Sequence, residues 1–139
     1  MSCSFPTLQQ VQQTADRLAG KVLETPVWRW QTGVIERSLS PETEVWLKLE
    51  LFQRSGSFKL RGALNCLAAL SADALRRGVA AASAGNHAMA VAQAARAAGT
   101  HARLAMPRSA SPARIAACQA DGADVQLTDT VHDAFALAQ

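Results

Sequence analysis

The chain has 139 residues, of which 49% are hydrophobic and 18% are charged, and its formal net charge at pH 7 is +3. This composition excludes a disordered polymer and allows one ordinary domain or a piece of a larger one. Basic residues are scattered rather than clustered, which argues against a nucleic-acid surface, and no apolar run has membrane-spanning length. The N-terminus lacks the apolar segment of a secretion signal, so we expect a cytoplasmic protein with reduced thiols at Cys3, Cys66 and Cys118.

The first thirty residues predict one helix followed by an extended segment. Apolar side chains recur at helical spacing from Leu8 to Leu18, and Gly20 follows as a cap at the C-terminal end. Pro26 then biases the chain away from helix. Trp28 and Trp30 share one face of a strand because they are two residues apart, and we expect them to cover a core rather than to stack on a ligand.

A second strand and a helix surround a lysine. Residues 45–50 alternate strictly, which predicts a half-buried strand with Val45, Leu47 and Leu49 on one side. A turn rich in serine and glycine follows, and then a helix whose inward stripe consists of Leu60, Ala63, Leu64, Leu67 and Ala68. Lys59 stands where this turn becomes the helix. A lysine held there can act as a covalent catalyst, and the alternative is an ordinary solvated lysine in a first turn.

From residue 78 onward, short strands alternate with helices. We expect strands over residues 79–82, 102–106 and 124–127, and helices over residues 86–98, from Pro112 to about Asp121, and from the capping box at Thr130 onward. This alternation predicts an α/β fold, in which a parallel sheet is flanked by helices. The last helix is still in its apolar pattern at Gln139, so we expect the architecture to continue beyond it.

A second turn that is suited to binding a ligand lies between a strand and a helix at residues 83–87. Such a turn presents free backbone N–H groups and the positive end of a helix dipole, which suit a carboxylate or a phosphate. Alone it is a weak motif, because many turns of this kind carry Gly-Asn. For His87 a capping or packing role outweighs that of a catalytic base. No histidine has partners at metal-ligand spacing, so we expect no metal site.

Two stretches taken together resemble a known family. Residues 53–63, QRSGSFKLRGA, followed by residues 83–88, SAGNHA, are similar to the signature of fold-type II pyridoxal-phosphate enzymes of the threonine dehydratase and serine racemase family. The similarity extends to residues 25–26, 106–107, 111–112 and 122–125, and so covers nearly the whole chain. It implies pyridoxal 5′-phosphate as the cofactor, a small amino acid as the substrate, and a homo-oligomer for full-length members.

The resemblance assigns roles to individual residues. Lys59 matches the lysine that bonds covalently to the cofactor and, once released, moves the α-proton of the substrate. Phe58 matches an aromatic residue beside the cofactor ring, and Asn86 matches the asparagine that hydrogen-bonds the ring hydroxyl. The loop that receives the substrate carboxylate is matched by Ser83, Ala84, Gly85, Asn86 and His87.

Departures from the family pattern refine the expected reaction. Ala84 stands where the racemases carry a serine that acts as an acid and base, so we expect elimination rather than racemisation. The reaction is then the removal of water from L-threonine or L-serine, which gives a 2-oxo acid and ammonia. Met89 and Ala90 replace the usual Gln-Gly and could narrow the space near the loop. Arg114 replaces a common lysine, a change that we expect to be structural.

The resemblance also implies how the chain is divided. Residues 1–70 would be the N-terminal part of the larger cofactor-binding domain, and residues 71–139 a small α/β domain of order βαβαβα. In this family, the glycine-rich loop for the cofactor phosphate and the residue that pairs with the pyridine nitrogen follow the equivalent of Gln139, and neither motif occurs here. One alternative is therefore a truncated, catalytically inactive fragment that acts at most as a binding or assembly module.

Overall fold

A three-stranded parallel sheet forms the centre of the C-terminal half. The computed structural model describes residues 5–138, so Cys3 lies outside the described residues. The sheet consists of β3 (Val79–Ala82), β4 (Ala102–Pro107) and β5 (Asp124–Thr128), with β4 in the middle and both pairs parallel. Every residue of β4 except Arg103 is buried. The predicted α/β fold with a parallel sheet is confirmed.

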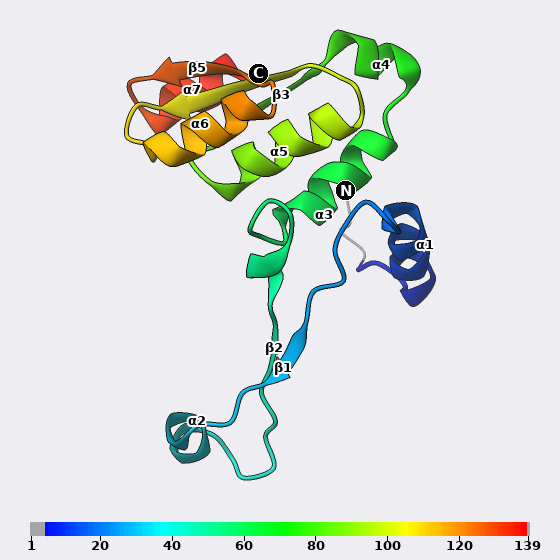
Figure 1. Ribbon diagram of the computed structural model, residues 1–139, viewed down its shortest axis with the longest axis vertical. Helices are drawn as coiled ribbons and strands as arrows, with labels where there is room; N and C mark the ends of the chain where they lie inside the picture. Colours follow the sequence, from blue (N-terminus) through cyan, green and yellow to red (C-terminus); the bar gives the residue numbers. More distant parts are fainter. Residues whose placement is uncertain (1–4, 139) are drawn as a thin grey trace.

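Helices cover both faces of this sheet (Figure 1). Helices α5 (Asn86–Ala97) and α6 (Pro112–Ala120) pack on one face, and α7 (Val131–Leu137) lies against the other. The capping box predicted for α7 is present, because Thr130 Oγ1 accepts from the N–H of Asp133 and the Asp133 carboxylate accepts from the N–H of Thr130. The two predicted helices that connect the parallel strands, α5 and α6, begin at the expected residues, Asn86 and Pro112.

The alanine-rich helix α5 also packs against α3 (Lys59–Ala68). The buried stripe of α3 is Leu60, Ala63, Leu64 and Leu67, as the apolar spacing predicted, but Ala68 is exposed, so its placement in that stripe was wrong. The helix α1 (Leu8–Leu18) packs on α3 and ends before Gly20, whose positive φ of 73° is the predicted cap geometry. A short helix, α4 (Ala72–Arg77), follows α3 and was not predicted.

A narrow ribbon extends away from these helices (Figure 1). It consists of the antiparallel strands β1 (Val27–Arg29) and β2 (Trp46–Lys48), and the short helix α2 (Gly33–Ser38), which was not predicted, lies at its far end. Trp28 is 51% exposed and Trp30 is half-buried, so the prediction that both indoles cover a core was wrong for Trp28. Among the described residues, β1 has extensive packing contacts only with β2, so no further layer covers Trp28.

The second predicted strand is shorter than expected. Only the three residues of β2 pair with β1, and the 3-10 helix η1 (Glu50–Phe52) begins where the alternation predicted the end of the strand. Val45, Leu47 and Leu49 are half-buried, as predicted. Within residues 5–138, none of the helices combines the length and the apolar character needed to cross a membrane.

Replacing Gly78 by alanine tests whether the backbone conformation just before β3 requires a glycine. Gly78 has φ 84° and ψ −177°, and a Cβ there would lie 2.8 Å from the carbonyl oxygen of His101, which already accepts from the N–H of Val79. We expect Gly78→Ala to lower the free energy of unfolding by about 2–4 kcal/mol in urea titrations.

The matched control is Gly122→Ala, because Gly122 has φ 83° but open space at the Cβ position. Backbone strain alone predicts a loss of about 1–2 kcal/mol there. Equal losses for the two variants would contradict a specific collision with His101.

Candidate functional site

Lys59 is the first residue of α3, and its side chain is exposed. The turn before it is held by hydrogen bonds. Gly56, at φ 70°, donates its N–H to the carbonyl oxygen of Gln53 over 2.6 Å. The Oγ of Ser57 accepts from the N–H of Lys59 at 3.4 Å, and the Oγ of Ser55 donates to the carbonyl oxygen of Ser57 at 3.4 Å. Both serines are buried, so the turn is fixed while the lysine side chain is accessible.

The aromatic ring of Phe58 lies beside the amine of Lys59. The Nζ atom is 4.6 Å from the centre of the ring, a distance typical of a cation–π contact. The ring is 59% exposed. The structure therefore places Lys59 and Phe58, which the family resemblance singled out, in direct side-chain contact. Both side chains are exposed to solvent.

An ion pair joins the two ends of this turn. Arg61 donates from Nε to Oε2 of Glu50 at 2.9 Å and from Nη2 to Oε1 at 2.7 Å. Oε1 also accepts from the hydroxyl of Thr25 at 2.5 Å, and the carbonyl oxygen of Thr25 accepts from Nζ of Lys48 at 2.6 Å. The Arg61 hydrogen bonds lower the pKa of Glu50 to about 2, although burial acts in the opposite direction.

The side chain of Gln53 ties the same turn to an earlier segment. Its Oε1 accepts from the N–H of Leu23 and its Nε2 donates to the carbonyl oxygen of Leu23, both at 2.9 Å. Gln53 is buried, so this amide replaces the backbone partners that Leu23 would otherwise lack. From the sequence alone, Gln53 stood out only as part of a motif, and no role followed for Glu50 or Arg61. No spacing rule links an acid and a base eleven residues apart across a turn.

The second loop presents unpaired donors. Ser83 extends the pairing of β3 by donating its N–H to Ala105, and its Oγ accepts from the N–H of Gly85 at 3.1 Å. Within the described chain, the structure records no acceptor for the N–H groups of Ala84, Asn86 and His87. Asn86 and His87 are exposed at the start of the 12-residue helix α5. This arrangement suits an anion, because free N–H groups and the helix dipole converge there.

Arg114 lies beside this loop. A Cβ built on Gly85 would be 3.8 Å from Nη1 of Arg114, in the first turn of α6. The side chain is exposed and forms no ion pair with any described residue. Its position near the loop could not be predicted from the sequence, because it depends on the parallel pairing of β3 with β4.

The lysine turn and the loop at residues 83–87 lie toward the same side of the molecule. Helices α3 and α5 pack side by side, and Figure 1 shows them running in the same direction from that side. The carboxyl ends of the parallel strands point the same way, which is where open α/β sheets bind ligands. No hydrogen bond joins residues 53–63 to residues 83–88 in the described part of the chain.

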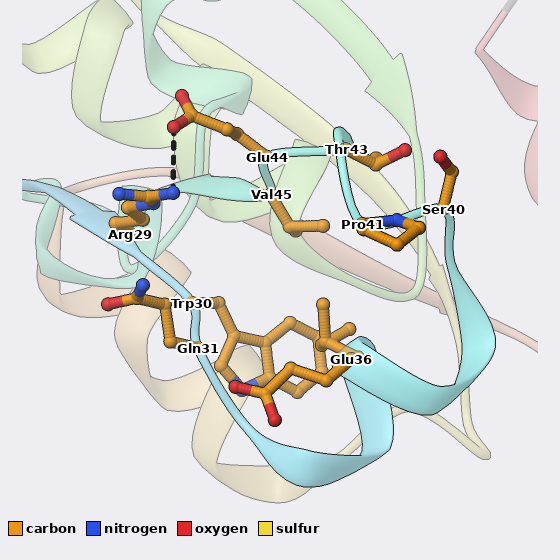
Figure 2. Close-up of a pocket in the computed structure, with 10 residues that line it drawn as sticks. Arg29, Trp30, Gln31, Glu36, Ser40, Pro41, Thr43, Glu44 and Val45 are labelled. Carbon is orange, nitrogen blue, oxygen red and sulfur yellow. Dashed lines mark ion pairs between the residues drawn. The ribbon is translucent and has the colours of Figure 1, made fainter.

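A separate cavity of about 310 Å³ lies between the ribbon and α2 (Figure 2). The ion pair between Arg29 and Glu44, at 2.7 Å, borders it, and the indole of Trp30 forms one wall. None of the expected site residues lines this cavity. Across residues 5–138, the structure shows no group of three or more side chains that could hold a metal ion.

Comparisons with known proteins cover both the lysine turn and the loop. The family described as pyridoxal-phosphate dependent enzyme matches residues 19–139. The phenylserine dehydratase of Ralstonia pickettii is 42% identical over 132 residues, which are 95% of this chain and 39% of that protein. The L-threonine ammonia-lyase of Thermotoga maritima is 48% identical over 90 residues, which are 65% of this chain and 22% of that protein.

A solved structure has the same fold. Maize serine racemase matches 94% of this chain and 39% of its own, with a TM-score of 0.81 and 30% sequence identity. The chain thus spans only 22–39% of the length of these three relatives.

The depressed pKa of Glu50 predicts a defined pH window. The stabilising contribution of its carboxylate is complete above the ordinary pKa of 4.5 and is lost as the pH falls toward 2. We therefore expect the difference in free energy of unfolding between the wild type and Glu50→Gln to be constant near neutral pH and to shrink over this acidic range. Urea titrations at stepped pH measure it.

Glu44→Gln is the control, because it removes an ion pair whose side chains are both about half exposed. Such pairs contribute about 0–1 kcal/mol. A Glu50→Gln difference that stays unchanged down to pH 2 would argue against the ion pair as the cause of the shift.

Proposed function

The chain belongs to the family of pyridoxal-phosphate dependent enzymes, and on this premise we propose that it forms part of an enzyme that removes water from a β-hydroxy amino acid. L-Threonine or L-serine would be converted into a 2-oxo acid and ammonia. The observation that carries the proposal is that Lys59 and the loop at residues 83–87 lie at the same end of two packed helices. The resemblance noted in the sequence, and with it the cofactor of the family, is confirmed.

The residues at the site fit pyridoxal 5′-phosphate. Lys59 offers an accessible primary amine for an aldehyde, and Phe58 offers an apolar surface next to that amine. Asn86 offers an exposed amide at the start of α5, as a partner for a ring hydroxyl. These three groups supply a covalent attachment, a packing surface and a hydrogen bond.

In the proposed reaction, the loop at residues 83–87 and Lys59 have separate roles. When bound, the cofactor supplies an electron sink that makes an α-proton removable and lets a β-hydroxyl leave. The N–H groups at residues 84, 86 and 87, for which the described chain offers no acceptor, would hold the substrate carboxylate without adding a competing base. This orients Cα toward Lys59, whose amine takes the α-proton. Loss of water gives an enamine, which hydrolyses to the 2-oxo acid and ammonia.

The side chain at position 84 favours elimination over racemisation. Ala84 carries only a methyl group, so it cannot deliver a proton to the face of Cα opposite Lys59. Among the three relatives, one is named for phenylserine, one for threonine and one for serine. The β-substituent is therefore the variable part of the substrate, and we propose L-threonine or L-serine.

The proposal includes a division of the chain near residue 70. Residues 1–70 contain the ribbon and the lysine helix and would belong to the larger domain, whereas residues 71–139 contain the three parallel strands of the described sheet. A cytoplasmic location and a homo-oligomeric state for the whole protein stay predictions.

A second candidate is a catalytically inactive fragment that binds or assembles with other chains. It is favoured by the exposure of Lys59, Phe58 and Asn86, because an open site leaves a bound cofactor in contact with water.

Turnover by the 139-residue chain distinguishes the two candidates. We expect the purified chain, incubated with pyridoxal 5′-phosphate and L-threonine or L-serine, to release 2-oxo acid. Lys59→Ala should lower this rate by about 10³-fold or more, because the proton-transferring amine is lost. A coupled assay that reduces the 2-oxo acid measures the rate.

Lys21→Ala is the matched control, since Lys21 lines the same hollows as Ala97 at the C-terminal end of α5, whereas the loop lies at the start of that helix, and it should leave the rate unchanged. If the wild-type chain released no more 2-oxo acid than a reaction without protein, the inactive fragment would be favoured. Equal release by Lys59→Ala would show that a different residue transfers the proton.

Arg114 provides a prediction about carboxylate binding. We expect Arg114→Gln to raise the Kd of L-serine by about fivefold to tenfold, because a guanidinium beside the N–H loop attracts the carboxylate. Shifts of the amide resonances of Asn86 and His87 measure the Kd without requiring turnover. Arg103→Gln is the control, because Arg103 lies at the amino end of β4 and pairs with Asp124. An unchanged Kd in Arg114→Gln would leave that residue with the structural role expected from its sequence.

A further inference from the structure

We propose that Glu50 and Arg61 are positioning residues for Lys59, which hold its backbone so that the amine is presented to an aldehyde. The inference rests on the proposed function, since it takes Lys59 as the lysine that bonds to the cofactor. It concerns residues to which the sequence assigned no role.

The first observation is that α3 begins without the usual cap. Its N-cap residue is Phe58, which makes no side-chain hydrogen bond to the helix, and the first turn contains no acidic residue. The hydroxyl of Ser57 accepts from the N–H of Lys59, but over a long distance of 3.4 Å. Arg61 instead places a positive charge in that first turn, where the helix dipole disfavours it. Helix propensity alone therefore leaves the position of Lys59 weakly determined.

The second observation is that Glu50 compensates for this charge. Its two oxygens accept both hydrogen bonds from Arg61, and a planar bidentate pair of this kind fixes orientation as well as distance. The side chains of Arg61 and Glu50 are only 33% and 15% exposed. In each of the other ion pairs of the described chain, at least one partner is 53% exposed or more.

The third observation is that the pair is anchored on its far side. Thr25 donates its hydroxyl to Glu50, and Nη2 of Arg61 also donates to the carbonyl oxygen of Leu23 at 3.3 Å. The ammonium of Lys48 donates to the carbonyl oxygen of Thr25, and its positive charge also acts on Glu50. Three separate segments thus converge on one carboxylate: residues 23–25, η1 and the first turn of α3.

The consequence concerns the amine itself. The side chain of Lys59 is exposed, and within residues 5–138 the structure records no hydrogen bond or ion pair for its Nζ besides the contact with the ring of Phe58, so its placement depends on the backbone from which it projects. That backbone is two residues before Arg61. Loss of the pair would leave the helix folded through its buried leucines but would loosen its first turn, where the hydrogen bond from the N–H of Lys59 to Ser57 is long at 3.4 Å.

Selective labelling measures this positioning directly. The chain contains three lysines, Lys21, Lys48 and Lys59, so each reports independently in the same sample. The folded protein is treated with pyridoxal 5′-phosphate, the adducts are reduced with borohydride, and peptide mass spectrometry gives the ratio of label on Lys59 to label on Lys21. We expect Lys59 to be preferred in the wild type.

Glu50→Gln should lower this ratio by about tenfold, because a reacting group that shifts by about 1 Å loses one to two orders of magnitude in rate. Glu50→Asp keeps the carboxylate and should restore most of the preference. Glu44→Gln removes an ion pair outside the turn and should leave the ratio unchanged. A merely structural role would lower the unfolding temperature without altering the ratio in the folded chain.

Thr25→Val provides a milder test in case Glu50→Gln does not fold, since it removes only the hydroxyl donor to Glu50. It should lower the ratio by about threefold. A wild-type preference that persists in every folded variant overturns the positioning role and leaves the proposed function standing. No preference for Lys59 in the wild type overturns the lysine assignment and the positioning role together.

Discussion

The packing of α3 against α5 is the contact on which the arrangement of the site depends. Leucines of α3 face a surface of α5 in which most buried residues are alanines, so the two helices approach closely. Dispersion and burial of this apolar surface hold the helices in register. Each helix begins at a functional turn, so fixing the two axes also fixes Lys59 relative to the loop at residues 83–87. The sheet contributes by anchoring α5 from its other side.

The C-terminal half was largely predictable from its sequence, because each boundary carries a local chemical signal. Gly78 and Gly99 end helices or turns with positive φ, and Thr130 with Asp133 caps α7, so the bounds of β3 and the starts of α5, α6 and α7 were confirmed, whereas α4 was not predicted. The strand expected over residues 102–106 is one residue longer, because Pro107 is the last residue of β4. A proline lacks an N–H, which matters little at the end of a strand.

The ribbon and the ion pair could not be predicted in the same way. Alternation indicated strands but could not tell that Trp28 would face solvent, because that depends on whether another layer covers the ribbon. The contact of Arg61 with Glu50 closes a turn, and it exists only once that turn has folded. The candidate site itself was found through a family resemblance rather than through periodicity, and the individual roles of Lys59, Phe58 and Asn86 stay predictions.

The ribbon has a consequence for how the folding of this chain can be followed. All three tryptophans, Trp28, Trp30 and Trp46, lie in or next to its strands, and the chain contains no tyrosine. Intrinsic tryptophan fluorescence therefore reports on the ribbon and does not report on the parallel sheet or its helices. Far-ultraviolet circular dichroism is dominated by those helices. The two signals observe different parts of one molecule, and their agreement or divergence during unfolding measures whether the ribbon is a cooperative part of the fold.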